Sequence, residues 1–455
     1  MKNGEHGIRF TYIEYCLVLA TFLICLTGAS LIGTNYCPDE GGRQMLSGWI
    51  FTNGTLPTGN ELETILPLWG FSYALRPYLA SIINAGFMKL FALFTTSPQA
   101  LRLASRMCSV CSVTLSCVYC LRFGHRVFKK RLSAILFALV VCWLPQVMFL
   151  GMYQNNDSLS LAAACMIVYY LAEGDDLGWP ARSCIGLGIA FSVALLSYYS
   201  VYGWILTGVV FCVVSVLRNN RIADKAPFIL KRALWLAAVC LLLAGWFFIR
   251  NARLHEGDFL GLASEDRSRV WAESQGVEVR YTGRSLQEEG YSLIGFFRYS
   301  DFHWIKKTLA SFIGVFGYLN IYMPVGRYIV YCVIFGLSAL GYIVTVRRGA
   351  PSQRDRHLFA AMLGAGAITF ILHVYQSYCR DFQAQGRYVI TAILPIAYMI
   401  AYSFDRAEDA LGVPARGTLS AARAQTPFRP GMAFALVWIV LLARTVADTM
   451  TKMLA

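Results

Sequence analysis

The chain has 455 residues, of which 57% are hydrophobic, 14% aromatic and only 15% charged. Soluble domains usually carry about 25% charged residues, so this composition excludes an ordinary soluble protein. The formal net charge is +14, but the basic residues fall in short clusters between apolar runs, and no continuous basic face for nucleic acid is visible. We therefore predict an all-α polytopic membrane protein that contacts the lipid bilayer and binds no nucleic acid.

The first apolar run, 11–33, is long enough to cross a bilayer. Lys2 and Arg9 precede it and few basic residues follow closely, so we expect a cytoplasmic N-terminus. A cleaved signal peptide is the alternative, because residues 28–30 (Gly-Ala-Ser) resemble a cleavage site. The run exceeds the usual apolar core of a signal peptide, which favours a retained span. A polar outer loop, 34–76, follows.

Further apolar runs predict the other spans, and basic clusters such as RFGHRVFKKR (122–131) mark the cytoplasmic side. We place these spans at 102–120, 132–150, 158–172, 184–199, 201–217, 233–250, 328–346, 358–375, 388–404 and 431–447. Consistent sidedness requires two more apolar segments, 77–96 and 305–324, to lie as juxtamembrane or re-entrant helices on the outer face.

The prediction is thus one transmembrane domain, 1–455, with about eleven transmembrane helices and no separate soluble domain. Its outer loops include 34–76, which carries an acidic motif, and 251–304, which we expect to be too polar to be buried. A basic linker, 405–430, precedes the last span.

Fourteen cysteines lie mostly inside apolar runs, where a thiol behaves as a small hydrophobe. The spacing Cys108-x-x-Cys111 with Cys117-x-x-Cys120 mimics a zinc site. On one continuous helix the two pairs face opposite sides, so they cannot close one tetrahedral site. Two other cysteines, Cys37 and Cys379, fall on the outer side, and the sequence leaves their pairing open.

The acidic motif is NYCPDEGGRQ (35–44), directly after the first span. Pro38 suits the first turn of a helix, and acids there face the positive end of the helix dipole. One interpretation is a capped juxtamembrane helix with a local ion pair between Arg43 and Asp39. The other is that the motif holds a carboxylate, Asp39 or Glu40, at the membrane boundary to act as a base.

The predicted topology brings polar groups from three separate segments to one side of the membrane. Ionisable groups at membrane boundaries are costly to desolvate, so their convergence favours a site over separate headgroup anchors. The three groups are Asp39, Glu40 and Arg43; Asn155, Asn156 and Asp157; and Arg380, Asp381 and Arg387.

Five stretches, in this order, resemble the GT-C superfamily of polyprenyl-phosphate-dependent membrane glycosyltransferases, and most closely its protein O-mannosyltransferase and aminoarabinose-transferase branch. They are PDEGGR (38–43), SGWIFTNGTLP (47–57), YQNNDSLSLAAACMIVYYL (153–171), GWFFIRNARLHEGDFLG (245–261) and QGRYVITAILPIAYMIAY (385–402). The resemblance implies inverting transfer of a sugar, hexose or pentose, from a polyprenyl-phosphate donor to a glycan, lipid or protein acceptor. The implied setting is the outer face of a plasma membrane, and a bacterial one is favoured.

The resemblance also implies roles for individual residues. We predict Asp39 and Glu40 as catalytic, with Asp39 as the base. A divalent ion, Mg²⁺ or Mn²⁺, is left open, with Asp39 and Asp157 as its candidate ligands. The predicted substrate-binding residues are Arg43, Asn156, Asp157, Arg380 and Arg387, the last two through guanidinium contacts with the departing phosphate. Arg43 is a departure from the pattern, because many relatives have His at this position.

Two other classes of function fit the composition. A lipid-linked sugar flippase or transporter would place charges and broken helices near the bilayer midplane, commonly with inverted repeats, and neither feature is evident. A polysaccharide polymerase or ligase of another fold would share the lipid donor.

Overall fold

The computed structural model describes residues 9–33, 36–67, 69–220, 222–279, 285–349, 351–410 and 430–454. Lys2 lies outside the described residues. The same is true of Asn35, which begins the acidic motif, and of most of the basic linker at 405–430. The predictions that rest on them have no structural counterpart.

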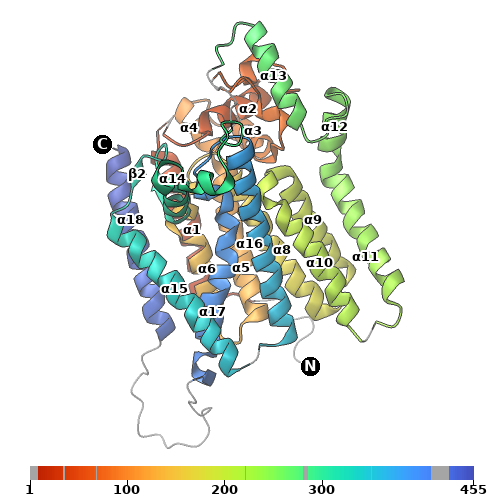
Figure 1. Cartoon of the computed structure of the whole chain (residues 1–455), viewed down its shortest axis with the longest axis vertical. Coiled ribbons are helices and arrows are strands. Elements are labelled where there is room, and N and C mark those ends of the chain that lie inside the picture. The colour runs from red at the N-terminus through yellow and green to blue at the C-terminus, as the bar shows by residue number, and fades with distance from the viewer. Residues whose placement is uncertain are drawn as a thin grey trace, which may run out of the picture.

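Within the described residues, eight helical segments are long and apolar enough to cross a membrane. They are α1 (Tyr12–Leu31), α4 with α5 (Pro98–Ala104 and Met107–Val127), α10 (Tyr202–Arg218), α11 with α12 (Lys225–Cys240 and Trp246–Leu254), α15 (Val325–Arg348), α16 (Gln353–Cys379), α17 (Ile393–Ala410) and α18 (Pro430–Leu454). Three further helices, α6 (Arg131–Cys142), α8 (Asp157–Leu177) and α9 (Ala181–Ser197), run in the same bundle (Figure 1). The prediction of an all-α polytopic membrane protein is confirmed.

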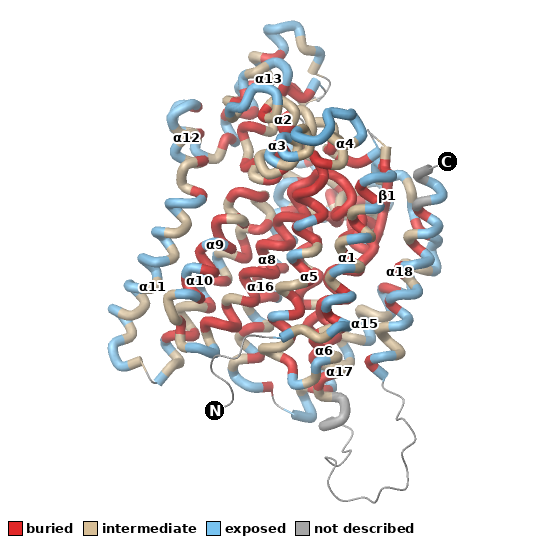
Figure 2. Tube along the Cα trace, turned by 180° about the vertical axis from the view of Figure 1, so that it is seen from behind, coloured by how far each residue is buried: buried red, intermediate tan, exposed pale blue. Residues whose placement is uncertain are grey.

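The core of the bundle lies along α5 and α8, and the helices at its edges face outward (Figure 2). In the segment formed by α4 and α5, 72% of the residues in the apolar membrane-spanning stretch are buried. The corresponding share is 17% for α11 with α12 and 11% for α15. Small side chains let the central helices approach closely, as in Ala162–Ala164 of α8, which are fully buried. The apolar outward faces of α11, α15 and α18 suit contact with lipid.

One end of the bundle carries further helices that build a cap: α2 (Glu40–Asn53), α3 (Leu79–Ala92), α13 (Leu262–Ser274) and α14 (Leu293–Ile313), which is kinked at 299–302 (Figure 1). The segment predicted as a juxtamembrane helix at 77–96 is α3, an apolar helix of 14 residues. We call this end the capped end.

The second predicted outer helix, 305–324, is correct only for its first half. After α14 ends at Ile313, β1 (Val315–Phe316) and β2 (Ile321–Tyr322) pair as a short antiparallel hairpin. Gly317 has φ of +59°, a left-handed conformation that glycine adopts readily and that turns the chain. The apolar residues of this stretch therefore form a hairpin, in which Val315 and Phe316 are buried, rather than a continued helix.

The loop at 251–304 is more structured than predicted, because it contains α13 and the start of α14. The expectation that it is too polar to be buried is wrong at Glu265, which is only 6% exposed. Arg76 donates two hydrogen bonds to this carboxylate, from Nε and from Nη2 (2.7 Å). A buried carboxylate is tolerated where such a partner neutralises it.

Candidate functional site

The acidic motif forms a sharp turn before α2. Asp39 has φ of +59°, in the left-handed region that Asp tolerates better than most non-glycine residues. α2 begins one residue later, at Glu40, so Pro38 lies before the helix and not in its first turn as predicted. The Asp39 side chain makes no capping hydrogen bond to α2. The turn leaves this carboxylate free to face away from the helix that follows it.

Glu40, the next residue, points into the bundle and is fully buried. Arg106, at the start of α5, donates hydrogen bonds of 2.8 Å from Nε and Nη2 to the two carboxylate oxygens. The backbone N–H of Gln154 donates a third, of 3.0 Å. Arg106 Nη1 also donates to the carbonyls of Ala29 and Ile32 at the end of α1. Glu40 therefore ties α1, α2 and α5 together and leaves no oxygen facing open space.

Arg387 brings the three predicted segments to one point. It lies in the short helix η5 (Gly386–Ala392) and is 1% exposed. Its Nη2 donates to Asp39 Oδ2 and to the Tyr388 hydroxyl (3.0 Å), and its Nε donates to Gln385 Oε1 (2.7 Å). Its Nη1 lies 3.8 Å from Asp157 Oδ2, at the start of α8. One guanidinium thus bridges carboxylates that are 118 positions apart in the sequence (157 − 39).

The pKa of the Asp39 carboxyl is set by opposing effects. Burial is the largest and raises this pKa, because a charge is less stable away from water. The positive charges of Arg387 and Arg43, with the hydrogen bond from Arg387, outweigh burial and hold the pKa below its ordinary value. Asp39 is consequently ionised at neutral pH.

Arg43 does not form the predicted ion pair with Asp39. Within the described residues its guanidinium has no carboxylate within 4.0 Å and lies over the ring of Tyr73, with 4.6 Å from Cζ to the ring centroid. Arg43 is 5% exposed, and its Nε has no hydrogen-bond partner. The local pair failed because the left-handed turn at Asp39 directs that side chain toward Arg387 instead.

The other predicted residues occupy different positions around this point. Asn156 is buried and donates hydrogen bonds to the carbonyls of Ser197 (2.8 Å) and Pro77 (3.3 Å), so it fixes the turn that precedes α8. Arg380 lies at the end of α16 with a side chain that is 54% exposed, 3.9 Å from Asp266 Oδ2 of α13. Arg380 is at the rim rather than beside Asp39.

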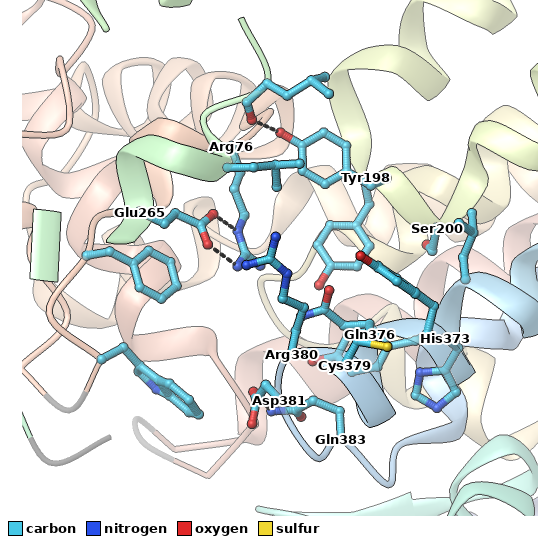
Figure 3. Close-up of a pocket in the computed structure, with 18 of the residues that line it drawn as sticks. Arg76, Tyr198, Ser200, Glu265, His373, Gln376, Cys379, Arg380, Asp381 and Gln383 are labelled. Atoms are coloured by element: carbon cyan, nitrogen blue, oxygen red, sulfur yellow. Dashed lines mark hydrogen bonds and ion pairs between the residues drawn. The ribbon is translucent and has the colours of Figure 1, made fainter. Parts of the chain in front are cut away.

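A cavity of about 1080 Å³ opens at the capped end, and Asp39 lines it. Its walls come from the loop before α3, the turn between α9 and α10, α13, and the end of α16 (Figure 3). The sequence analysis did not single out several wall residues: Arg76, Tyr198, Glu265, His373 and Tyr388. Aromatic and paired charged residues are common in membrane proteins, so only their position around one cavity distinguishes them.

The predicted metal ligands do not fit a divalent cation. Asp39 and Asp157 both face Arg387, so the guanidinium occupies the space between the two carboxylates where a cation would lie. No group of three or more His, Cys, Asp or Glu side chains suited to a metal occurs among the described residues. Cys37 and Cys379, whose pairing the sequence left open, are both free thiols.

No protein-family model matches the sequence, and no curated protein matches it significantly. Solved structures do match. ArnT from Cupriavidus metallidurans, bound to undecaprenyl phosphate, superposes with a TM-score of 0.55 at 16% identity, over 97% of this chain and 72% of ArnT. The apo oligosaccharyltransferase from Archaeoglobus fulgidus gives a TM-score of 0.52 at 13% identity, over 97% of this chain.

The chain therefore shares the fold of ArnT and of this oligosaccharyltransferase. A second structure of the Archaeoglobus fulgidus enzyme, tethered to an acceptor peptide, agrees with a TM-score of 0.54 at 14% identity. The chain spans 56% of the length of that oligosaccharyltransferase. At these identities the likeness establishes the architecture, and the reaction must be argued from the site itself.

Proposed function

We propose that this protein is an inverting glycosyltransferase that moves a sugar from a polyprenyl-phosphate donor to an acceptor in the cavity at the capped end. The observation that carries the proposal is the position of Asp39: an ionised carboxylate on the cavity wall, beside the buried guanidinium of Arg387. The GT-C fold supports it, as does the undecaprenyl phosphate bound in the ArnT structure.

The reaction needs one base. A hydroxyl oxygen of the acceptor attacks the anomeric carbon of the donor sugar while Asp39 accepts the hydroxyl proton. The bond from that carbon to the phosphate oxygen breaks, and polyprenyl phosphate leaves with the electron pair. Because a phosphate leaves without a proton, no paired acid is required, unlike in a glycosidase. A single displacement inverts the anomeric configuration.

Arg387 links donor binding to the base. A phosphate near its guanidinium competes with Asp39 for the same N–H donors, because both are anions of suitable geometry. When the N–H donors of Arg387 bond to the phosphate, Asp39 loses part of its stabilising interaction and becomes a stronger base. Asp157, 3.8 Å from Arg387 Nη1, keeps the guanidinium in place during this exchange. Arg43 supplies a second positive charge close to Asp39.

The other predicted residues act less directly in this proposal. Glu40 is a positioning residue, because its oxygens are held by Arg106 and it fixes α2 behind Asp39. Asn156 holds the turn that carries Asp157. Arg380, at the rim, meets the acceptor on entry.

We further propose that the capped end faces outward from a plasma membrane, with the N-terminus cytoplasmic, and favour a bacterial setting. Basic residues at the other end support this orientation under the positive-inside rule. Lys129 and Lys130 lie at the turn between α5 and α6, and Arg347 and Arg348 end α15.

The test is transfer from a radiolabelled polyprenyl-phosphate sugar by the purified protein in nanodiscs. Asp39→Asn should lower the rate roughly 10²- to 10⁴-fold, the usual contribution of a general base. Asp224→Asn is the matched control, because Asp224 is an exposed carboxylate before α11. If the Asp39→Asn protein transfers sugar at the wild-type rate, Asp39 is not the base. If the donor crosses the bilayer and no acceptor is consumed, the protein is a flippase.

A further inference from the structure

The charged side chains of the cavity wall are largely neutralised by one another. Arg76 is paired with Glu265 through two hydrogen bonds, one from each of two guanidinium nitrogens (Figure 3). Asp266 lies 3.9 Å from Arg380 and 3.4 Å from Arg269. A charged ligand in this part of the cavity would have to break such pairs, whereas an uncharged one would leave them intact.

Several neutral polar groups of the same wall have no hydrogen-bond partner in the described part of the chain. His373 is 4% exposed, yet its Nε2 is unpaired. Among the described residues, the hydroxyls of Tyr73 and Tyr198 and the side-chain amide of Gln376, which is exposed, also have no hydrogen-bond partner. A buried polar atom such as His373 Nε2 is normally satisfied, so this atom, with the unpaired groups beside it at the cavity surface, calls for a ligand that supplies donors and acceptors.

Aromatic faces lie between these polar groups. The rings of Tyr198 and Tyr388 stack with centroids 5.8 Å apart and an interplanar angle of 19°. His373 lies beside Tyr388, 5.6 Å between centroids, and is backed by Trp304 at 5.0 Å. The wall therefore alternates flat apolar surface with neutral hydrogen-bonding groups, and rigid aromatic side chains hold it in place.

A sugar ring has the matching surface, with C–H groups on its face and hydroxyls around its rim. We propose that this wall binds an uncharged saccharide, so that the acceptor of the proposed transfer reaction is a neutral glycan. The wall is formed by Tyr73, Tyr198, Ser200, His373, Gln376 and Tyr388. This inference rests on the proposed function and specifies the acceptor for it.

The size of the cavity supports a glycan of more than one residue. Ligand sites commonly enclose about 300–1,000 Å³ for a drug-sized molecule, and this cavity is about 1080 Å³. Asp39 on the same wall gives the reacting hydroxyl access to the base. A peptide acceptor has no exposed strand edge to pair with in this wall, whose elements are helices and turns.

The test measures binding without transfer, by saturation-transfer difference NMR on the full chain in nanodiscs free of sugar-based detergent. The probes are maltotetraose, cellotetraose, mannotetraose and chitotetraose, compared with an acetylated tetrapeptide and glucose 1-phosphate. At least one neutral tetrasaccharide should bind, and Gln376→Ala and His373→Asn should each weaken it roughly 3- to 10-fold, the value of one hydrogen bond. Gln376 is exposed, so its variant keeps the test valid if His373→Asn folds poorly.

Gln353→Ala is the matched control, an exposed glutamine at the opposite end of α16, and should bind like the wild type. Binding of the peptide or the sugar phosphate in place of every tetrasaccharide would overturn the proposal, as would binding of no tetrasaccharide. Saccharide binding without sugar transfer would contradict the proposed reaction but support the saccharide-binding site. Sugar transfer to a peptide without saccharide binding would support the proposed reaction and contradict the saccharide-binding site.

Discussion

Two adjacent acids, Asp39 and Glu40, meet an arginine each, and the two pairs differ in what surrounds them. Glu40 and Arg106 are both fully buried, and both carboxylate oxygens and all three guanidinium nitrogens are hydrogen-bonded to protein. Asp39 has a side chain that is 27% exposed, on the wall of a large cavity, while Arg387 behind it is 1% exposed. The comparison separates a closed, structural pair from a pair whose carboxylate faces the cavity, where we propose that it acts as the base.

The largest effect should come from breaking the closed pair. Arg106→Leu leaves Glu40 buried and unpaired, which should cost about 3–5 kcal/mol of unfolding free energy. The measurement is denaturant unfolding of the purified protein. The double variant Arg106→Leu with Glu40→Leu should recover much of the loss, because no uncompensated charge remains. If the single variant unfolds like the wild type, Glu40 and Arg106 do not hold the bundle together.

The open pair should respond in activity rather than in stability. Arg387→Lys keeps the positive charge but loses the forked guanidinium, whose Nη2 bonds to Asp39 while Nη1 lies near the Asp157 carboxylate. A lost charge-assisted hydrogen bond is worth about 1.5–3 kcal/mol, so transfer should fall roughly 10- to 100-fold. Initial rates with the labelled donor check this, with exposed Arg182 changed to Lys as the control. Undiminished transfer would place the phosphate elsewhere.

The acidic limb of the pH–rate profile should report Asp39. Its folded-state pKa is lowered, so the base stays ionised through the neutral range and is lost only as pH falls through that lowered pKa. The stability that this carboxylate contributes is likewise present above its unfolded-state pKa and declines as pH falls. Arg387→Gln removes the main lowering charge, so the acidic limb of kcat/KM should move to higher pH. A limb that does not move would argue that another group titrates.

The smallest effect should come from the rim. Arg380 is half exposed, and its pair with Asp266 at 3.9 Å is accessible to solvent. Such pairs contribute about 0–1 kcal/mol, so Arg380→Gln should change KM for the acceptor less than about fivefold and leave kcat unchanged. Raising the salt concentration should reduce even this difference, because salt screens exposed charges. A loss as large as that of Arg387→Lys would move Arg380 from the rim into the reacting centre.

The sequence by itself determined the membrane bundle and the segments that carry the site. Long apolar runs and their basic flanks have one stable solution in a bilayer, since backbone groups must be paired within helices. The same logic placed the segment that forms α3 on the same face of the membrane as the acidic motif, and it grouped Asp39, Asp157 and Arg387 on that side. These predictions depend on hydropathy and on the number of spans between two segments, which decides whether the segments lie on the same side of the membrane. Both can be read locally along the chain and added up.

Only the tertiary structure decided what each side chain does there. A single left-handed residue sends Asp39 to Arg387 rather than to Arg43, and a pattern of residue types carries no such backbone information. Contacts between distant segments decide the different environments of Glu40 and Asp39. They also pair the buried Glu265 with Arg76 and build the cavity wall around His373. Charge and packing partners that meet only in three dimensions set the environment of each group, and that environment sets its chemistry.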